Sequence, residues 1–164
     1  MTTKADVITA IEAVEVRVER LTPRILAHAD AGLPDGEWRV REALCHLAAR
    51  ANSVPIATAA AQRARAAQAQ GQPALRRGSF SIDEVNQRQI DDRRNRSIQA
   101  LLDEIHAGHQ AELRAISDLD PQSLDLRFPA FTGEGDMSLA ELLLLAGPGH
   151  DNNHLDQIEQ AIGR

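Results

Sequence analysis

Two histidines near the C-terminus have the spacing of a metal-ligand pair. They are the ends of the segment His150-Asp151-Asn152-Asn153-His154. On a helix, residues four apart project from one face with their Cα atoms about 6 Å apart along the axis, so both imidazoles can reach one metal ion. A third histidine, His46, lies far earlier in the chain and would complete the set from a facing helix.

Three histidine ligands define a particular kind of metal chemistry. Neutral imidazole is the commonest protein ligand, and three protein ligands with a fourth position open is the usual arrangement of catalytic zinc. Three neutral ligands leave the 2+ charge of the ion uncompensated. Such a centre lowers the pKa of a bound water towards about 7, or holds a thiol as its thiolate.

Ligating histidines also need an acceptor for the second ring N–H. Glu42 lies one turn before His46 on the same helix face, and Asp151 and Gln157 are the nearest polar residues beside the C-terminal pair. The spacing therefore predicts Glu42, Asp151 and Gln157 as the partners of the three ligands. The sequence assigns no catalytic residue.

The other reactive side chains are interpreted as structural or surface residues. His28, His106 and His109 lie near loops or charged stretches, and we expect them at the surface. Cys45 is the only cysteine, which rules out an intramolecular disulfide and a thiolate-rich metal site. Because adjacent helical residues point about 100° apart, Cys45 is expected to pack away from a site that His46 faces.

Composition favours one helical domain spanning residues 1–164. Apolar residues make up 43% of the chain, mostly Ala and Leu, whereas aromatic residues make up 2%. Such a composition suits helices better than sheets, and the length suits one domain.

Net charge and hydropathy indicate which binding partners and which cellular location to expect. The net charge of −6 has the wrong sign for a general nucleic-acid binder, so we expect no nucleic-acid partner. No stretch reaches the roughly 18 apolar residues that span a bilayer, and the N-terminus has no apolar signal core. We therefore expect no membrane association and a cytoplasmic location.

Apolar periodicity predicts four helices that would carry these residues. The predicted helices span about 3–29, 40–70, 82–119 and 139–162, with Pro55 kinking or dividing the second. Ser138 is an N-cap candidate with Glu141 as its capping-box partner. Between the third and fourth helices, only the run from 124 to 131 is strand-like. Four helices around one core predict a bundle, a fold in which facing helices commonly build metal sites.

The last helix contains a sequence that disfavours a regular helix. Gly147, Pro148 and Gly149 directly precede the first histidine of the pair. Proline lacks a backbone N–H and glycine has low helix propensity. We therefore expect a kink or local opening there, one turn from the proposed ligands.

Two segments resemble the DinB/YfiT-like superfamily. Glu37-Trp38-Arg39-Val40-Arg41-Glu42-Ala43-Leu44-Cys45-His46-Leu47 is similar to its tryptophan-to-histidine segment, in which the first metal histidine has an LxHL context. His150 to Ile158 is similar to its C-terminal HxxxHxxQI signature. The region around Val85-Asn86 and 93–97 resembles members related to the N-terminal domain of mycothiol-dependent maleylpyruvate isomerase.

The resemblance implies a fold, a cofactor and a reaction class. It implies an all-α four-helix bundle of up-down-down-up topology, frequently a homodimer, with a divalent metal ion, zinc or nickel, on His46, His150 and His154. Characterised relatives transfer low-molecular-weight thiols such as mycothiol or bacillithiol, so the resemblance implies a metal-dependent thiol S-transferase acting on small electrophiles. Maleylpyruvate isomerisation itself is not expected, because the Gly-Pro-Gly before His150 departs from the motif and the isomerase's further domain has no counterpart.

Two alternatives remain open at the level of sequence. The bundle could bind a metal or a small ligand without turnover. Alternatively, His150-Asp151-Asn152-Asn153-His154 could be a variant of the HExxH zinc-peptidase motif, an HDxxH motif of a zinc-dependent hydrolase with Asp151 as the base.

Overall fold

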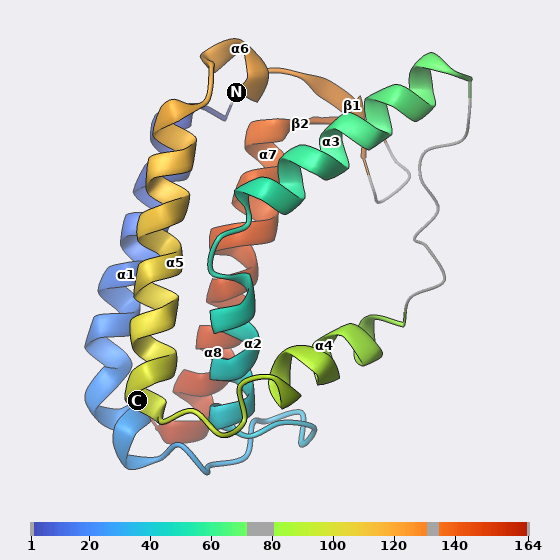
Figure 1. The fold of residues 1–164 in the computed structure, drawn as a ribbon. Coiled ribbons are helices and arrows are strands. Elements are labelled where there is room, and N and C mark those ends of the chain that lie inside the picture. Colours follow the sequence, from blue (N-terminus) through green and yellow to red (C-terminus); the bar gives the residue numbers. More distant parts are fainter. Residues whose placement is uncertain (1, 72–80, 131–134, 164) are drawn as a thin grey trace.

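The computed structural model describes residues 2–71, 81–130 and 135–163 (Figure 1). Its elements, in chain order, are α1 (Lys4–Ala27), α2 (Val40–Arg50), α3 (Val54–Ala69), α4 (Ile82–Asp91), α5 (Ile98–Asp118), α6 (Pro121–Leu124), β1 (Arg127–Pro129), β2 (Asp136–Ser138), α7 (Leu139–Leu144), the π-helical turn η1 (Leu145–Gly149) and α8 (His150–Ile162).

Four helical columns form the body of the molecule. They are α1, α2, α5 and the continuous helical run α7–η1–α8. The chain direction of α1 and of the α7–η1–α8 run is the same, and α2 and α5 run in the opposite direction (Figure 1). This arrangement confirms the all-α bundle with up-down-down-up topology. In the described part of the chain, no helix combines the length and apolar character that a membrane span requires.

The predicted second helix, residues 40–70, is two helices. α2 ends at Arg50, and α3 starts at Val54 with Pro55 in its first turn. Proline is tolerated there because the first backbone N–H groups of a helix have no intrahelical partner. α3 leaves the bundle at an angle, and α4 packs against α2 (Figure 1).

The predicted third helix, residues 82–119, is also divided, and in this respect the prediction was wrong. α4 ends at Asp91, and α5 begins after Ser97, whose side chain accepts a hydrogen bond from the backbone N–H of Ala100. This N-cap gives α5 a start of its own. Arg93 and Arg96, in the connection, both bind Glu104 on α5.

A short hairpin closes one end of the bundle. β1 pairs antiparallel with β2, and Phe128 on β1 is fully buried. β1 falls inside the strand-like run predicted from 124 to 131, although residue 131 lies outside the described residues. Ser138 and Glu141 form the predicted capping box at the start of α7.

The expected irregularity before His150 is a π-helical turn. η1 spans Leu145–Gly149 with Pro148 inside it. A π-helical turn holds one extra residue and so accommodates a proline that has no N–H to donate. The backbone is tight here, because a Cβ on Gly149 would lie 2.9 Å from the carbonyl oxygen of Leu144.

The apolar core is divided into two clusters along the bundle axis. One is built from α1, α2, α5 and α8, and the other mainly from α1, α3, α7 and the hairpin. Four buried polar residues lie along the chain between residues of one cluster and residues of the other: Ser53, His109, Glu112 and Asp151. We call these four residues the polar layer.

Gly108 sets how closely α5 approaches the end of α2. A Cβ added to Gly108 would lie 2.4 Å from Ala51 Cβ and 3.0 Å from its carbonyl carbon. We predict that Gly108→Ala lowers the free energy of unfolding by about 1–3 kcal/mol, the usual cost of overpacking, as measured by urea denaturation. Gly32→Ala is the matched control, because nothing lies within 4 Å of its added Cβ. Equal stability of the two variants would show that this packing is loose.

Candidate metal centre

The fold brings the three predicted histidines together. His46 projects from α2, and His150 and His154 from the first turns of α8. The Nε2 atoms of His46 and His150 are 2.9 Å apart, and one ligand atom from each of the three residues lies within 4.8 Å of the others. Zn–N bonds of 2.0–2.1 Å at tetrahedral angles place ligand nitrogens about 3.3 Å apart. The donor set therefore fits a divalent ion with small ring movements.

Each of these rings has an acceptor on its other nitrogen. Nδ1 of His46 lies 2.8 Å from Oε1 of Gln89, Nδ1 of His150 lies 3.3 Å from Oδ1 of Asp151, and Nδ1 of His154 lies 3.0 Å from Oε1 of Gln157. An acceptor at Nδ1 places the proton there and leaves the Nε2 lone pair free for a metal. Asp151 and Gln157 thus lie beside His150 and His154, and their role as partners of metal ligands stays a prediction.

The predicted partner of His46 was wrong. The carboxylate of Glu42 accepts a hydrogen bond from the backbone N–H of Arg39, which closes the capping box of α2. Gln89 on α4 holds His46 instead. Spacing along α2 could not identify Gln89, because the prediction placed residues 82–119 in one continuous helix rather than folding α4 back over α2.

The surroundings of His46 and His154 favour their neutral forms. Burial, followed by the neighbouring His150 and His154, lowers the pKa of His46 to about 3. Burial and His150 also lower the pKa of His154, although its hydrogen bond to Gln157 opposes the shift. Neutral imidazoles offer their lone pairs at physiological pH, as metal ligands must.

Trp38 forms one wall of the site. Its ring stacks on His154 with a centroid distance of 5.7 Å, and it meets the tilted ring of His46 at 5.2 Å. Trp38 is half-buried and packs against the apolar cluster of α1, α2, α5 and α8. The indole therefore limits the orientations of the His46 and His154 rings and makes their surroundings less polar.

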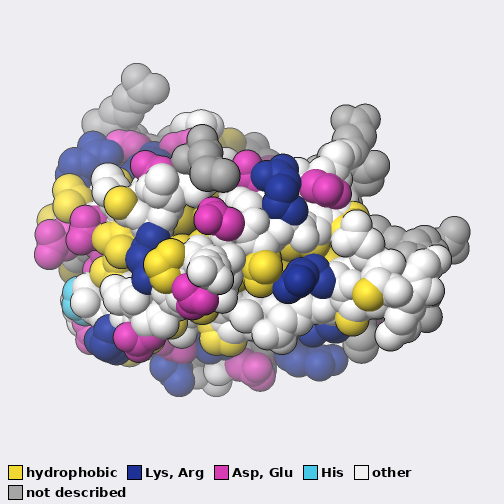
Figure 2. Space-filling model, turned by 90° about the horizontal axis from the view of Figure 1, so that it is seen from above, with side chains coloured by type: hydrophobic (Ala, Val, Ile, Leu, Met, Phe, Trp, Pro, Cys, Tyr) yellow, Lys and Arg dark blue, Asp and Glu magenta, His cyan; other side chains and the backbone are white. Residues whose placement is uncertain are grey.

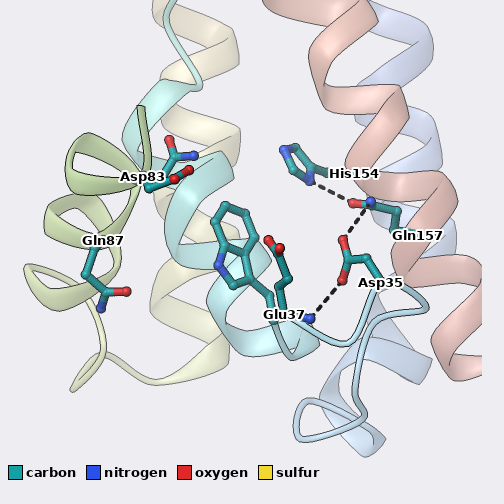
Figure 3. A pocket seen from close by; sticks show the side chains of 8 residues that line it. Asp35, Glu37, Asp83, Gln87, His154 and Gln157 are labelled. Atoms are coloured by element: carbon teal, nitrogen blue, oxygen red, sulfur yellow. Dashed lines mark hydrogen bonds between the residues drawn. The ribbon is translucent and has the colours of Figure 1, made fainter. Parts of the chain in front are cut away.

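A cavity of about 230 Å³ opens beside this wall (Figure 3). In Figure 3, Asp83 and Gln87 on α4 lie on one side of it, and His154 and Gln157 on α8 lie on the other. Trp38, Asn86 and two further acidic residues, Asp35 and Glu37, complete the lining. Asp35 accepts a hydrogen bond from Gln157, which links the cavity edge to the partner of His154. A small molecule in this cavity would therefore contact a ligand histidine directly.

His109 is not at the surface, contrary to the prediction. Its side chain is 2% exposed, with Nδ1 bonded to Glu15 on α1 and Nε2 donating to Oδ2 of Asp151 at 3.1 Å. Burial alone would lower the pKa of His109, but the hydrogen bonds and charges of Asp151 and Glu15 raise it to about 9. A positively charged imidazole thus connects α1, α5 and α8. The other oxygen of Asp151 faces His150, so this series of hydrogen bonds extends to one of the three candidate ligands.

Two further predictions concern His106 and Cys45. His106 is exposed as expected and bonds the second oxygen of Glu15. Cys45 is buried in the apolar cluster, and burial raises the pKa of its thiol. A buried, protonated thiol is a poor nucleophile, which agrees with its interpretation as a packing residue.

Together these observations define a DinB-like helical bundle whose three histidines could hold a metal ion. Residues 9–144 match the family model described as the mycothiol maleylpyruvate isomerase N-terminal domain. The chain belongs to this family. The match includes His46 and ends before the C-terminal histidine pair, and no curated protein matches the chain.

Solved structures of similar fold cover nearly the whole chain. An uncharacterised protein from Escherichia coli UTI89 has a TM-score of 0.65 at 17% identity, covering 98% of this chain and 93% of that one. The colibactin self-resistance protein ClbS, in complex with double-stranded DNA, has a TM-score of 0.66 at 13% identity, covering 98% and 95%. An uncharacterised protein from Clostridium difficile 630 has a TM-score of 0.66 at 10% identity, with the same coverage. At these identities the likeness concerns the fold.

The expectation of no nucleic-acid partner is corrected by this comparison. A protein with the same fold has been crystallised with double-stranded DNA, so overall acidity is not a sufficient ground for excluding one. Net charge averages over the surface, whereas DNA contacts depend on local cations. Figure 2 shows Lys and Arg side chains interspersed with Asp and Glu on the face that it presents.

We predict that His46→Ala abolishes stoichiometric binding of zinc or nickel, because it removes the ligand that α2 contributes. Metal content after dialysis, measured by atomic emission, tests this. His28→Ala is the control, since His28 is exposed and does not belong to the group of three. Undiminished metal in His46→Ala would contradict the three-histidine site.

We predict that the fold loses stability at alkaline pH because His109 loses its proton. The pKa of His109 rises on folding from its ordinary 6.5 to about 9. Its stabilisation is therefore complete below about 6.5 and is lost as pH rises through 9. Urea denaturation between pH 6 and 10 should show this decline in the wild type and not in His109→Gln. His106→Gln, which removes the exposed neighbour on Glu15, should retain the decline; a flat wild-type profile would contradict the prediction.

Proposed function

We propose that the protein is a divalent-metal-dependent thiol S-transferase that acts on small electrophiles. The observation that carries this proposal is the convergence of three imidazoles within 4.8 Å, each with an acceptor beside its Nδ1. Membership of the mycothiol maleylpyruvate isomerase N-terminal domain family supports a thiol as the co-substrate. Zinc and nickel are the metals that we propose.

The ligand set leaves room for an exogenous ligand. His46, His150 and His154 would supply three ligands, and a site with three protein ligands usually keeps a further position for water or substrate. When bound, the ion supplies a positive charge that lowers the pKa of a coordinated thiol, so that the nucleophilic thiolate forms at neutral pH. In the transfer, the sulfur forms a bond to carbon, the leaving group departs with its electron pair, and the thiol proton passes to solvent.

The residues of the chain would hold and orient the reactants. His46, His150 and His154 would hold the ion, with Gln89, Asp151 and Gln157 fixing their rings. The cavity beside Trp38 and His154 has room for a small molecule. Because Cys45 is buried and its pKa raised, the thiol would come from outside, from a low-molecular-weight compound such as mycothiol.

The hydrolase alternative is less consistent with the geometry. Asp151, the base that an HDxxH motif would need, is 4% exposed and is hydrogen-bonded to both His109 and His150. Burial would raise its pKa, but these two histidines lower it. A carboxylate used in this way holds a ligand and is not free to take a proton from water.

We predict that the metal-loaded protein accelerates conjugation of mycothiol or bacillithiol to a generic electrophile such as a bromobimane, followed by fluorescence. Acceleration should fall by about 100-fold or more in His154→Ala, because loss of outer partners alone costs 10–100-fold at metal sites. Cys45→Ala should retain it. A protein that binds one metal ion per chain but accelerates neither thiol would instead be a metal-binding bundle without turnover.

A further inference from the structure

Arg50 places a positive charge next to the three histidines. It lies four residues after His46, hence on the same face of α2 and about 6 Å further along the axis. Its Nη2 contacts the carbonyl oxygen of Ala146 at 3.5 Å, and Ala146 lies four residues before His150. The guanidinium therefore spans the space between α2 and η1, next to the point where His46 and His150 meet.

The hydrogen-bonding capacity of Arg50 is largely unused. Its Nε is buried and has no hydrogen-bond partner, and a contact of 3.5 Å from Nη2 is a weak one. Within residues 2–71, 81–130 and 135–163, no ion pair involves Arg50, whereas Arg17, Arg93 and Arg96 each bind a carboxylate. The Nε–Nη2 edge of the guanidinium therefore has no strong partner. Because a buried donor without an acceptor costs free energy, an acceptor at this edge would stabilise the protein.

Charge is distributed unevenly around the candidate metal centre. Arg50 contributes to lowering the pKa of both His46 and His154, so its charge acts on the site. A bound divalent ion would add a second positive charge beside it, and an anionic group between the two would relieve the repulsion. The cavity on the other side of His154 is lined by Asp35, Glu37 and Asp83, which disfavour an anion there.

We propose that Arg50 selects a ligand that carries a carboxylate and orients that group away from the acidic cavity. The Nε–H and the Nη2–H lie on one edge of the planar guanidinium, which matches the two oxygens of a carboxylate. This inference rests on the proposed function, since it concerns the thiol that would occupy the open metal position. It makes Arg50 a specificity-determining residue of that site.

Two thiols that differ in one group test the proposal. Protein loaded with cobalt(II) is titrated with 3-mercaptopropionate and with 3-mercaptopropanol, and coordination is followed by the thiolate-to-cobalt absorption band. We expect the carboxylate thiol to bind about 10- to 100-fold more tightly, the range that a charge-assisted hydrogen bond supplies. In Arg50→Gln the ratio should approach one, with the affinity for mercaptopropanol unchanged.

Control variants separate this effect from damage to the fold. Arg65→Gln removes an exposed arginine of α3 and should keep the wild-type ratio. Arg50→Lys keeps the positive charge but lacks the planar edge, so its ratio should lie between those of the wild type and Arg50→Gln. A wild-type ratio near one, or a full ratio in either Arg50 variant, overturns the inference and leaves the proposed function standing.

A different result would concern the proposed function. If cobalt binds but neither thiol produces the band, thiol coordination fails. The inference is then tested with propionate, whose binding is followed through the fluorescence of Trp38, the single tryptophan. Tighter binding to the wild type than to Arg50→Gln supports a carboxylate site at Arg50, and equal binding overturns it.

Discussion

The neutralisation of a buried positive charge organises this bundle. His109 carries its proton in the interior because Glu15 and Asp151 accept hydrogen bonds from both ring nitrogens. Breaking a buried pair by removing one partner costs about 3–5 kcal/mol, so α1, α5 and α8 must stay in register for the charge to be tolerated. The two apolar clusters on either side tolerate many substitutions of similar volume, whereas this contact tolerates few.

The same interior holds histidines with opposite protonation states. His46 has a lowered pKa and His109 a raised one, although both are buried. The difference lies in their partners: His46 meets the neutral amide of Gln89, and His109 meets two carboxylates. Asp151 connects the two environments, because one of its oxygens faces His109 and the other faces His150. A single side chain, that of Asp151, thus lies between the charged His109 and the group formed by His46, His150 and His154.

The sequence was sufficient to predict what depends on local spacing. The helix faces, the capping box at Ser138 and the irregularity around Pro148 all follow from residues close together in the chain. The convergence of His46 with the distant C-terminal pair was expected from the resemblance and from the bundle that it implies. It was not sufficient for Gln89 and His109, whose environments depend on how α4 folds back over α2 and how α1 meets α5. A charged stretch such as 88–96 gives no periodic signal of a chain reversal, and a histidine between polar neighbours looks the same whether buried or exposed.

The π-helical turn has a consequence for how such a site arises. η1 contains one more residue than an α-helical turn would, and each residue advances a helix by about 100°. Deletion of a single codon within residues 145–149 would rotate His150 and His154 by that angle relative to α7, away from His46. Conversely, one residue inserted into a regular helix at this point would turn an outward-facing pair of histidines towards α2.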